Sequence, residues 1–254
     1  RICTLLLNSD DKLSGLTMLR KHIIDNPESI NQIWNTFAIP TILLQEVIKS
    51  YEFIQTKSLI FILPTITPTI EILIKLSPSK EFRELCVSAQ LPLFLYPILN
   101  SPIKEDSIES IKTLCLKFIH ILLNGNDSDL NSSVEFFKNT ELVPLCLRNM
   151  ELGTEKTKIA ASNVLYSIIS NREGLEYACQ TYDRFMATSM ILNSVLVQIE
   201  TIQSIELLEI IIKIYTKLCD MPNAKVVFSK NRPHMLYTEH IREMVRNNPS
   251  VKTA

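Results

Sequence analysis

Three segments of the chain repeat one pattern of apolar positions: an apolar residue, a proline and, three residues after the proline, a leucine. Pro40, Pro92 and Pro144 occupy the second position and lie 52 residues apart. Proline is favoured in the first turn of a helix, because its missing N–H needs no partner there. Apolar side chains follow each proline at helical spacing, namely Leu43, Val47 and Ile48, then Leu95, Ile98 and Leu99, then Leu147 and Met150. The pattern predicts a helix that begins at each proline.

Polar turns with helix-capping residues lie upstream of these predicted helices. They are Asn26-Pro27-Glu28-Ser29, Ser77-Pro78-Ser79-Lys80 and the polar run from Asn124 to Ser133, with two further examples at Asn171-Arg172-Glu173-Gly174 and Asp220-Met221-Pro222-Asn223. The sequence therefore predicts a repeating unit that consists of a turn, a short helix, a sharp bend and a long helix. Other apolar stretches of helix length separate the units, at Ile108 to Leu123, Ala160 to Ile169 and Ile205 to Leu218.

The repeat predicts an all-α fold, an armadillo- or HEAT-like α-solenoid of roughly five to six helical repeats. Isoleucine is abundant and favours strands, so this prediction depends on spacing rather than on propensity. The chain has only four glycines, which are too few for phosphate-binding loops and tight hairpins. We expect a single domain over residues 1–254, with the tail after about residue 226 the least certain part of the repeat.

Composition narrows the function classes. The net charge is −1, so no global basic field attracts nucleic acid. The six cysteines, Cys3, Cys86, Cys115, Cys146, Cys179 and Cys219, form no C-x-x-C pair and stand singly in apolar stretches, as buried reduced thiols do. The uncharged stretch from Ser58 to Ile70 is too short for a membrane span and contains two prolines. These features favour a soluble protein of a reducing, intracellular compartment with no membrane partner. We expect the cytoplasm as its location, with the nucleus as a second compartment.

Motifs that carry chemistry are missing from the sequence. None of the four histidines has metal-ligand spacing, and His120, inside an apolar stretch, suits a partly buried histidine. The lone Gly153 and Gly174 suit helix ends or turns. No nucleophile elbow, dinucleotide fingerprint or Walker loop is present. We therefore expect no catalytic residue, no cofactor and no metal.

Two kinds of surface feature keep binding functions open. Small basic clusters occur at Lys156 with Lys158 and at Arg242 with Arg246, for which a solvated face and a phosphate contact are the two alternatives. The segment from Tyr177 to Phe185 is dense in polar aromatic residues and arginine, the types enriched at protein-binding hot spots. Packing at a repeat junction explains the same segment equally well.

Several strings of this sequence resemble the "required for cell differentiation" family, the armadillo-repeat subunits of the Ccr–Not mRNA deadenylase complex. The resemblance runs in order from about Ile2 to Lys225, with departures around Ser58 to Pro64, near Asn124 to Asp129 and after Val226. It is carried by Ile33-Trp-Asn-Thr-Phe37, Leu43-Leu-Gln-Glu-Val47, Leu91-Pro-Leu-Phe-Leu-Tyr-Pro97, Pro144-Leu-Cys-Leu-Arg148 with Met150-Glu151, Gly174-Leu-Glu-Tyr-Ala-Cys-Gln-Thr-Tyr-Asp-Arg-Phe185 and Met190-Ile-Leu192.

The resemblance implies a non-enzymatic scaffold or adaptor. Members of the family bind the large scaffold subunit of the complex and recruit regulators of mRNA decay and translational repression. The regulators supply short helical peptides to a groove or Trp-containing segments to surface pockets, and some members bind single-stranded nucleic acid. Two alternatives remain open, a single-stranded nucleic-acid-binding protein and an unrelated armadillo adaptor, and a homodimer is compatible with either.

The resemblance also supplies candidate protein-binding residues. Tyr182 and Arg184 match the family's Y-x-R at the Trp-pocket region, where stacking or cation–π contacts are expected. The full candidate set is Tyr182, Arg184, Lys158, Ala160, Ser110 and Lys117.

Four departures bear on these sites. Glu206 and Asn223 replace two basic residues of the family pattern, and Ser110 and Lys117 replace a Tyr and a Gly of its groove. They predict altered pockets and a groove that takes a different peptide, or none.

Overall fold

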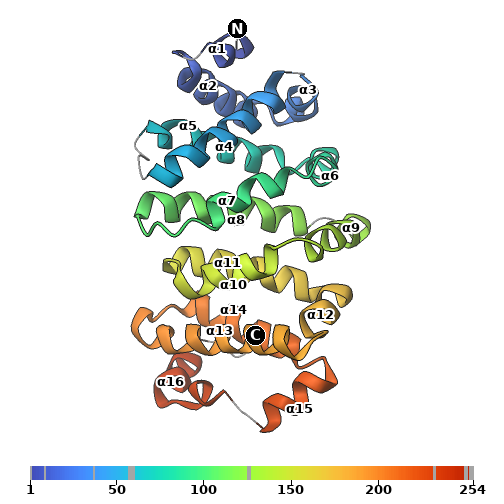
Figure 1. The fold of residues 1–254 in the computed structure, drawn as a ribbon, viewed down its shortest axis with the longest axis vertical. Coiled ribbons are helices and arrows are strands. Elements are labelled where there is room, and N and C mark those ends of the chain that lie inside the picture. The colour runs from blue at the N-terminus through green and yellow to red at the C-terminus, as the bar shows by residue number, and fades with distance from the viewer. Residues whose placement is uncertain are drawn as a thin grey trace. The chain divides into compact units, whose positions relative to one another are not determined.

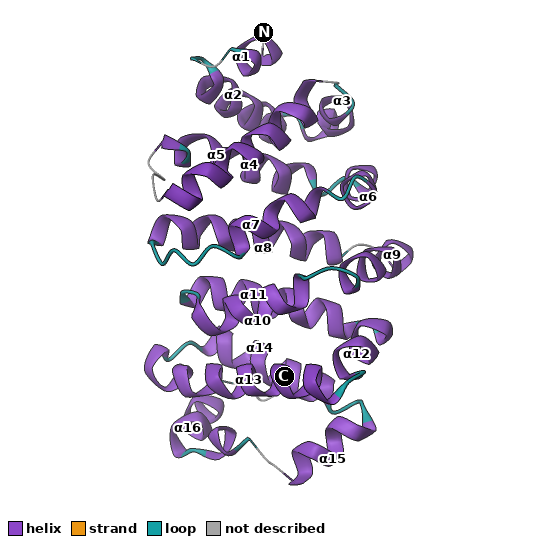
Figure 2. Cartoon of the chain, viewed as in Figure 1, coloured by secondary structure: helices purple, strands orange, loops and turns teal. Residues whose placement is uncertain are grey.

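The computed structural model describes residues 2–8, 10–36, 38–56, 61–124, 127–230, 233–248 and 251. Helices and short connections make up all of the described chain (Figure 2), which confirms the predicted all-α class. The chain divides into two compact units, Arg1–Gly125 and Asn126–Ala254, and each is described by itself (Figure 1). Whether the two units act as the single predicted domain stays a prediction.

The first unit contains two successive helical repeats that follow an initial helix pair. Equivalent helices pack on one another: α2, α5 and α8 form one row, and α3 packs on α6 in another. The elements are α1 (Ile2–Leu7), α2 (Lys12–Asp25), the 3₁₀ turn η1 (Pro27–Ser29), α3 (Ile30–Trp34), α4 (Ala38–Thr56), α5 (Leu63–Leu76), α6 (Lys80–Ser88), η3 (Leu91–Leu95), α7 (Tyr96–Leu99) and α8 (Asp106–Leu123).

The second unit has the same packing of equivalent helices on one another. Helix α9 packs on α12, α10 on α13 and α11 on α14, so each helix of one repeat lies against its counterpart in the next. This stacking buries apolar faces that a single repeat would leave exposed. The elements are α9 (Asp127–Lys138), α10 (Leu142–Leu152), α11 (Glu155–Ser170), α12 (Arg172–Cys179), α13 (Tyr182–Ile202), α14 (Ile205–Leu218), α15 (Pro222–Lys230), η4 (His234–Tyr237) and α16 (Glu239–Asn247).

The prolines mark helix starts as predicted, with one difference. Pro40 and Pro144 lie in the first turns of α4 and α10, which begin two residues earlier. Pro92 lies in the first turn of η3, directly after Gln90 bends the chain in the left-handed region at φ 55°. The expected long helix is absent after Pro92, because the five-residue η3 is followed by a separate short helix, α7, which begins at Tyr96 and has Pro97 in its first turn.

The capping turns are confirmed at several sites. The Ser79 hydroxyl accepts a hydrogen bond from the Phe82 N–H at the start of α6, and Pro222 is the first residue of α15. The prediction of a turn through Asn124 to Ser133 was wrong for its second half, because α9 begins at Asp127. Residues 125 and 126 of that run lie outside the described chain.

The cysteines are free thiols, and the expectation of burial is confirmed for half of them. Cys86, Cys115 and Cys146 are buried, whereas Cys3, Cys179 and Cys219 are half-buried.

Helix α13 is long and apolar enough to cross a membrane, judged by length and composition alone, among the residues that the structure describes. The core helix of a water-exposed domain meets the same criterion. Here Phe185, Leu192, Val195, Leu196 and Ile199 of α13 are buried inside the second unit.

Candidate functional site

The connection between α12 and α13 is fixed by two side-chain caps. The Asn171 side chain accepts a hydrogen bond of 2.9 Å from the Glu173 N–H and starts α12. The Thr181 hydroxyl accepts one of 3.3 Å from the Arg184 N–H and starts α13. Caps of this kind satisfy N–H groups that the helix itself leaves unpaired. They place Tyr177, near the end of α12, beside Arg184, in the first turn of α13.

Arg184 and Tyr177 form a stacked pair. The guanidinium carbon of Arg184 lies 4.2 Å from the centre of the Tyr177 ring, within the range of a cation–π contact. One guanidinium nitrogen also donates a 2.8 Å hydrogen bond to the Gln180 side-chain oxygen. The arginine is therefore held on the aromatic ring although it is exposed to solvent.

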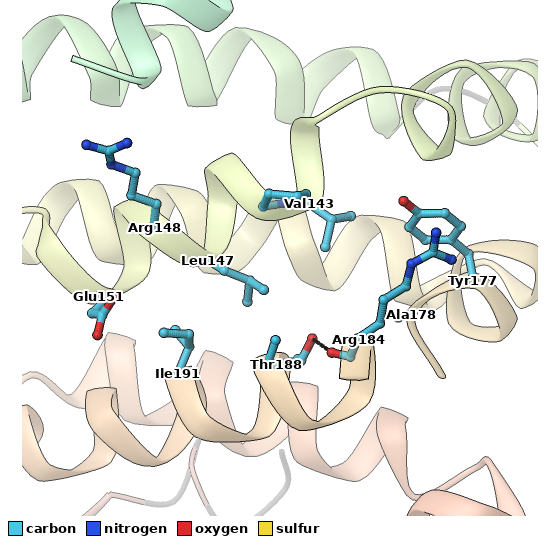
Figure 3. Close-up of a pocket in the computed structure, with 11 residues that line it drawn as sticks. Val143, Leu147, Arg148, Glu151, Tyr177, Ala178, Arg184, Thr188 and Ile191 are labelled. Atoms are coloured by element: carbon cyan, nitrogen blue, oxygen red, sulfur yellow. Dashed lines mark hydrogen bonds between the residues drawn. The ribbon is translucent and has the colours of Figure 1, made fainter. Parts of the chain in front are cut away.

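An apolar pocket of about 350 Å3 opens beside this pair, among α10, α12 and α13 (Figure 3). Its volume falls at the lower end of the range of ligand pockets, about 300–1,000 Å3. Arg184 and Tyr177 form one end, and Glu151 lies near the other, while Arg148 points away from the apolar side chains. The lining consists of Val143, Pro144, Leu147, Arg148, Glu151, Tyr177, Ala178, Arg184, Ala187, Thr188 and Ile191.

The floor of this pocket is buried and its mouth is not. Val143, Ala178 and Thr188 are nearly inaccessible, and the Thr188 hydroxyl donates a 3.0 Å hydrogen bond to the Arg184 carbonyl. Ala187 is exposed and Ile191 half-buried, so both are within reach of a ligand. A buried apolar floor with few polar groups at the edge suits an apolar side chain.

A second, polar hollow of about 910 Å3 lies on the other side of the stacked pair. Tyr177 and Arg184 line both spaces and so form their common wall. The other lining residues are Glu135, Lys138, Asn139, Glu173, Glu176, Cys179, Gln180, Met221 and Asn223.

Lys138 joins two carboxylates in this hollow. Its ammonium contacts Glu135 and lies 3.1 Å from a Glu173 oxygen. The hydrogen bonds to Glu135 and then Glu173 raise the pKa of Lys138. The hydrogen bond from Lys138 lowers the pKa of Glu135. Near neutral pH Lys138 and Glu135 are therefore both charged.

The groups around the two spaces are of types that suit binding. Burial raises the pKa of the Cys179 thiol, which makes it a poorer nucleophile near neutral pH. Within the described residues, no group of three His, Cys, Asp or Glu side chains is placed to hold a metal ion. The site offers stacking, apolar contact, hydrogen bonding and ion pairing.

Of the six candidate residues, Arg184 alone lines the two spaces described above. Arg184 lines both spaces, whereas Tyr182, two residues earlier in α13, has 70% of its surface exposed and lines neither. Lys158 and Ala160 lie in α11 of the same unit and are buried. The Lys158 ammonium donates to the carbonyl oxygens of Met150, at 2.9 Å, and Glu151, at 2.7 Å, at the end of α10.

The solvated-face interpretation of Lys158 was therefore wrong. The last carbonyl groups of a helix lack partners within the helix and carry partial negative charge, so they attract a buried ammonium. Lys156 is exposed as expected.

Ser110 and Lys117 belong to α8 in the first unit, away from the Arg184 site in the chain. Seven residues apart, they lie on one helix face, and both are exposed. The Ser110 hydroxyl donates to the Asp106 carbonyl within α8, at 2.8 Å. Their role in a peptide groove stays a prediction.

The departures from the family pattern fall at different places. Asn223 lines the polar hollow with Arg184, so the loss of a basic residue there bears directly on the site. Glu206 is exposed in the first turn of α14 and lines neither space.

The pocket floor was missed by sequence reasoning. Val143 and Leu147 were assigned only as apolar residues of a helix after Pro144, and Ile191 only as part of a resembling string. Their helical spacing was a usable signal for a shared face, but it does not reveal which helix lies opposite. Lys138, Glu173 and Glu176 had no signal beyond charge.

Comparisons with known proteins agree with the resemblance noted in the sequence. A model of the "Cell differentiation family, Rcd1-like" matches residues 2–254. The chain is 29% identical over 228 residues to "Cell differentiation protein rcd1" of Schizosaccharomyces pombe, which covers 87% of this chain and 77% of that protein. It is 30% identical over 223 residues to "Protein CAF40" of Saccharomyces cerevisiae, which covers 87% of this chain and 59% of that protein.

Proposed function

Because the chain belongs to the Rcd1-like cell differentiation family, we propose that it is a non-catalytic adaptor subunit of the Ccr–Not mRNA deadenylase complex. In this role it binds the large scaffold subunit and brings regulators of mRNA decay and translational repression to the nucleases. The match over residues 2–254 supports the proposal, because it extends through both compact units. The proposed compartments are the cytoplasm and the nucleus.

The regulator site in this proposal is the apolar pocket among α10, α12 and α13. An apolar side chain of a regulator peptide, with tryptophan the one the resemblance favours, enters the pocket and packs on Leu147 and Ile191. Arg184, already stacked on Tyr177, covers one end of the bound side chain. The stacked pair at the edge of an apolar pocket is the observation that carries this part of the proposal.

The second candidate, nucleic-acid binding, has less support at this site. Phosphate contacts need unpaired cations, and Arg184 lies beside a hollow lined by three glutamates. The peptide-binding adaptor is therefore the function we favour.

The test is a pull-down from native cell lysate with the chain as bait, read by mass spectrometry. Ala187→Phe fills the pocket from an exposed helix position without changing charge. Ala89→Phe, at the exposed end of α6, is the matched control outside the pocket.

We expect the wild-type chain and Ala89→Phe to recover the scaffold subunit, the nucleases and regulators. Ala187→Phe should keep the scaffold and lose the regulators that use the pocket. Absence of the scaffold from the wild-type sample would refute the adaptor proposal. Equal recovery of every regulator by Ala187→Phe would refute the pocket as their site.

A further inference from the structure

The charges of the polar hollow are unequally exposed. The side chains of Glu135, Glu173 and Glu176 are 53%, 55% and 53% exposed, whereas that of Lys138 is 23% exposed. The carboxylates therefore reach solvent while the ammonium that joins two of them lies beneath. Three partly exposed carboxylates therefore line the surface that a ligand meets, beside a less exposed ammonium.

The other cations of this region leave these carboxylates accessible to a ligand. Arg184 is held on the Tyr177 ring and on Gln180, so its charge lies along the wall. Arg172 contacts Glu176 at 3.0 Å, but its side chain is 91% exposed, and ion pairs of that kind contribute little and exchange easily. Glu173 and Glu176 are three apart on α12, so both face the same side and are available together to an incoming cation.

We infer that this hollow binds a lysine or arginine side chain of the same peptide whose apolar side chain fills the neighbouring pocket. The inference rests on the proposed function, because it needs the apolar pocket to hold a peptide. The hollow and the pocket share Tyr177 and Arg184 as a wall, so the two peptide side chains lie within a few residues of each other. The bound cation pairs with Glu173 and Glu176 at the rim.

The polar amides of the hollow suit the connecting backbone. Asn223 and Gln180 both line it, and Asn223 makes no hydrogen bond to another part of the described chain. An amide side chain offers a donor and an acceptor, the pair that a peptide group needs. The site thus combines an apolar anchor, a backbone contact and a charge contact.

The experiment starts from a phage library of short random peptides, selected on the full chain at low salt. Peptides that also bind Ala187→Phe are removed by counter-selection, so that the remainder depend on the apolar pocket. The remaining peptides are synthesised with a fluorescent label, and their affinities are measured by anisotropy. The charge variant is Glu173→Lys with Glu176→Lys, and the matched control is Glu200→Lys with Glu243→Lys, two exposed glutamates outside both spaces. Circular dichroism checks that both double variants fold.

We expect lysine or arginine to be enriched within about three residues of the apolar anchor. The charge variant should bind such peptides about tenfold more weakly at low salt, since each reversed pair costs severalfold in affinity. The difference in affinity between the charge variant and the wild type should shrink at about 0.5 M salt, because the screening length falls to a few ångströms there. The control should bind as the wild type does.

Two other outcomes distinguish a failure of this inference from a failure of the proposed function. Pocket-dependent peptides without basic enrichment, or with unchanged affinity for the charge variant, overturn the charge inference and leave the apolar pocket in place. A selection that yields no peptide dependent on Ala187 overturns both this inference and the peptide-binding part of the proposed function.

Discussion

Gly174 allows the closest approach between two helices around the candidate site, which makes Gly174→Ala a sharp test of the structure. It is the third residue of α12, and a Cβ atom there would lie 2.0 Å from the carbonyl oxygen of Ile168 in α11. The same atom would lie 2.8 Å from the Ile168 carbonyl carbon. Backbone atoms cannot be moved aside by a rotamer change, so the two helices must separate.

Two opposing terms set the size of the effect. Alanine is favoured over glycine inside a helix by about 1 kcal/mol. Overpacking that forces a backbone shift costs about 1–3 kcal/mol, and a contact this short against backbone belongs at the upper end. We therefore expect Gly174→Ala to lower the free energy of unfolding by about 2 kcal/mol, even though helix propensity alone predicts a gain.

The assay is urea unfolding followed by circular dichroism, with Gly15→Ala as the control. Gly15 lies inside α2, and its added Cβ would meet the Leu6 nitrogen at 3.0 Å, a contact that a small shift relieves. The free energy of unfolding should fall much less in Gly15→Ala than in Gly174→Ala. Since α12 carries Tyr177, the separated helix should also weaken peptide binding in the pocket. A Gly174→Ala chain as stable as the wild type would refute the packing described for α11 and α12.

Two further substitutions probe buried charges. Burial raises the pKa of Glu46, but the hydrogen bonds from Lys12 and Lys49 outweigh burial and leave that pKa below its usual value. Glu46 therefore stabilises the fold above the unfolded-state pKa of about 4.3. This stabilisation is lost as the pH falls through the lower pKa of the folded state. Urea unfolding over a pH series should therefore show wild type more stable than Glu46→Gln by about 1–3 kcal/mol near pH 7, with a gap that closes in acid; a constant gap would contradict this linkage. Lys158→Met should lower the free energy of unfolding by about 1–2 kcal/mol in the same assay, because the carbonyls of Met150 and Glu151 lose a buried donor. An unchanged value would mean that the cost of burying the ammonium offsets its hydrogen bonds.

The sequence was informative about helices because their starts depend on local chemistry. Pro40 and Pro144 mark first turns through the fixed backbone angle of proline, and the Ser79 cap acts within three residues. The same local logic misled at the polar run that contains α9, because capping residues there sit inside a helix that packs on α12. Tertiary packing overrides a weak local preference in such a case.

The candidate site was predictable only in part. The string from Gly174 to Phe185 contains both members of the stacked pair, yet the pattern did not distinguish Tyr177, on which Arg184 stacks, from its neighbours. Lys158 was assigned to the surface because a lysine is rarely buried, and only the end of α10 explains its position. Such contacts join residues from different helices, and spacing along one helix does not encode them.

In the peptide-binding function proposed above, the two spaces that share the stacked pair have different roles in recognition. The apolar pocket supplies contact area but little discrimination, since an extra methylene group changes binding by only about 1–3 kcal/mol. The exposed glutamates beside it distinguish ligands by charge, and like charges there oppose binding. Because these glutamates lie on α12 and α9, away from the apolar floor, a change among them alters which peptides bind without disturbing the core. Under this proposal, a substitution among these glutamates changes the peptide that is bound while the fold is kept.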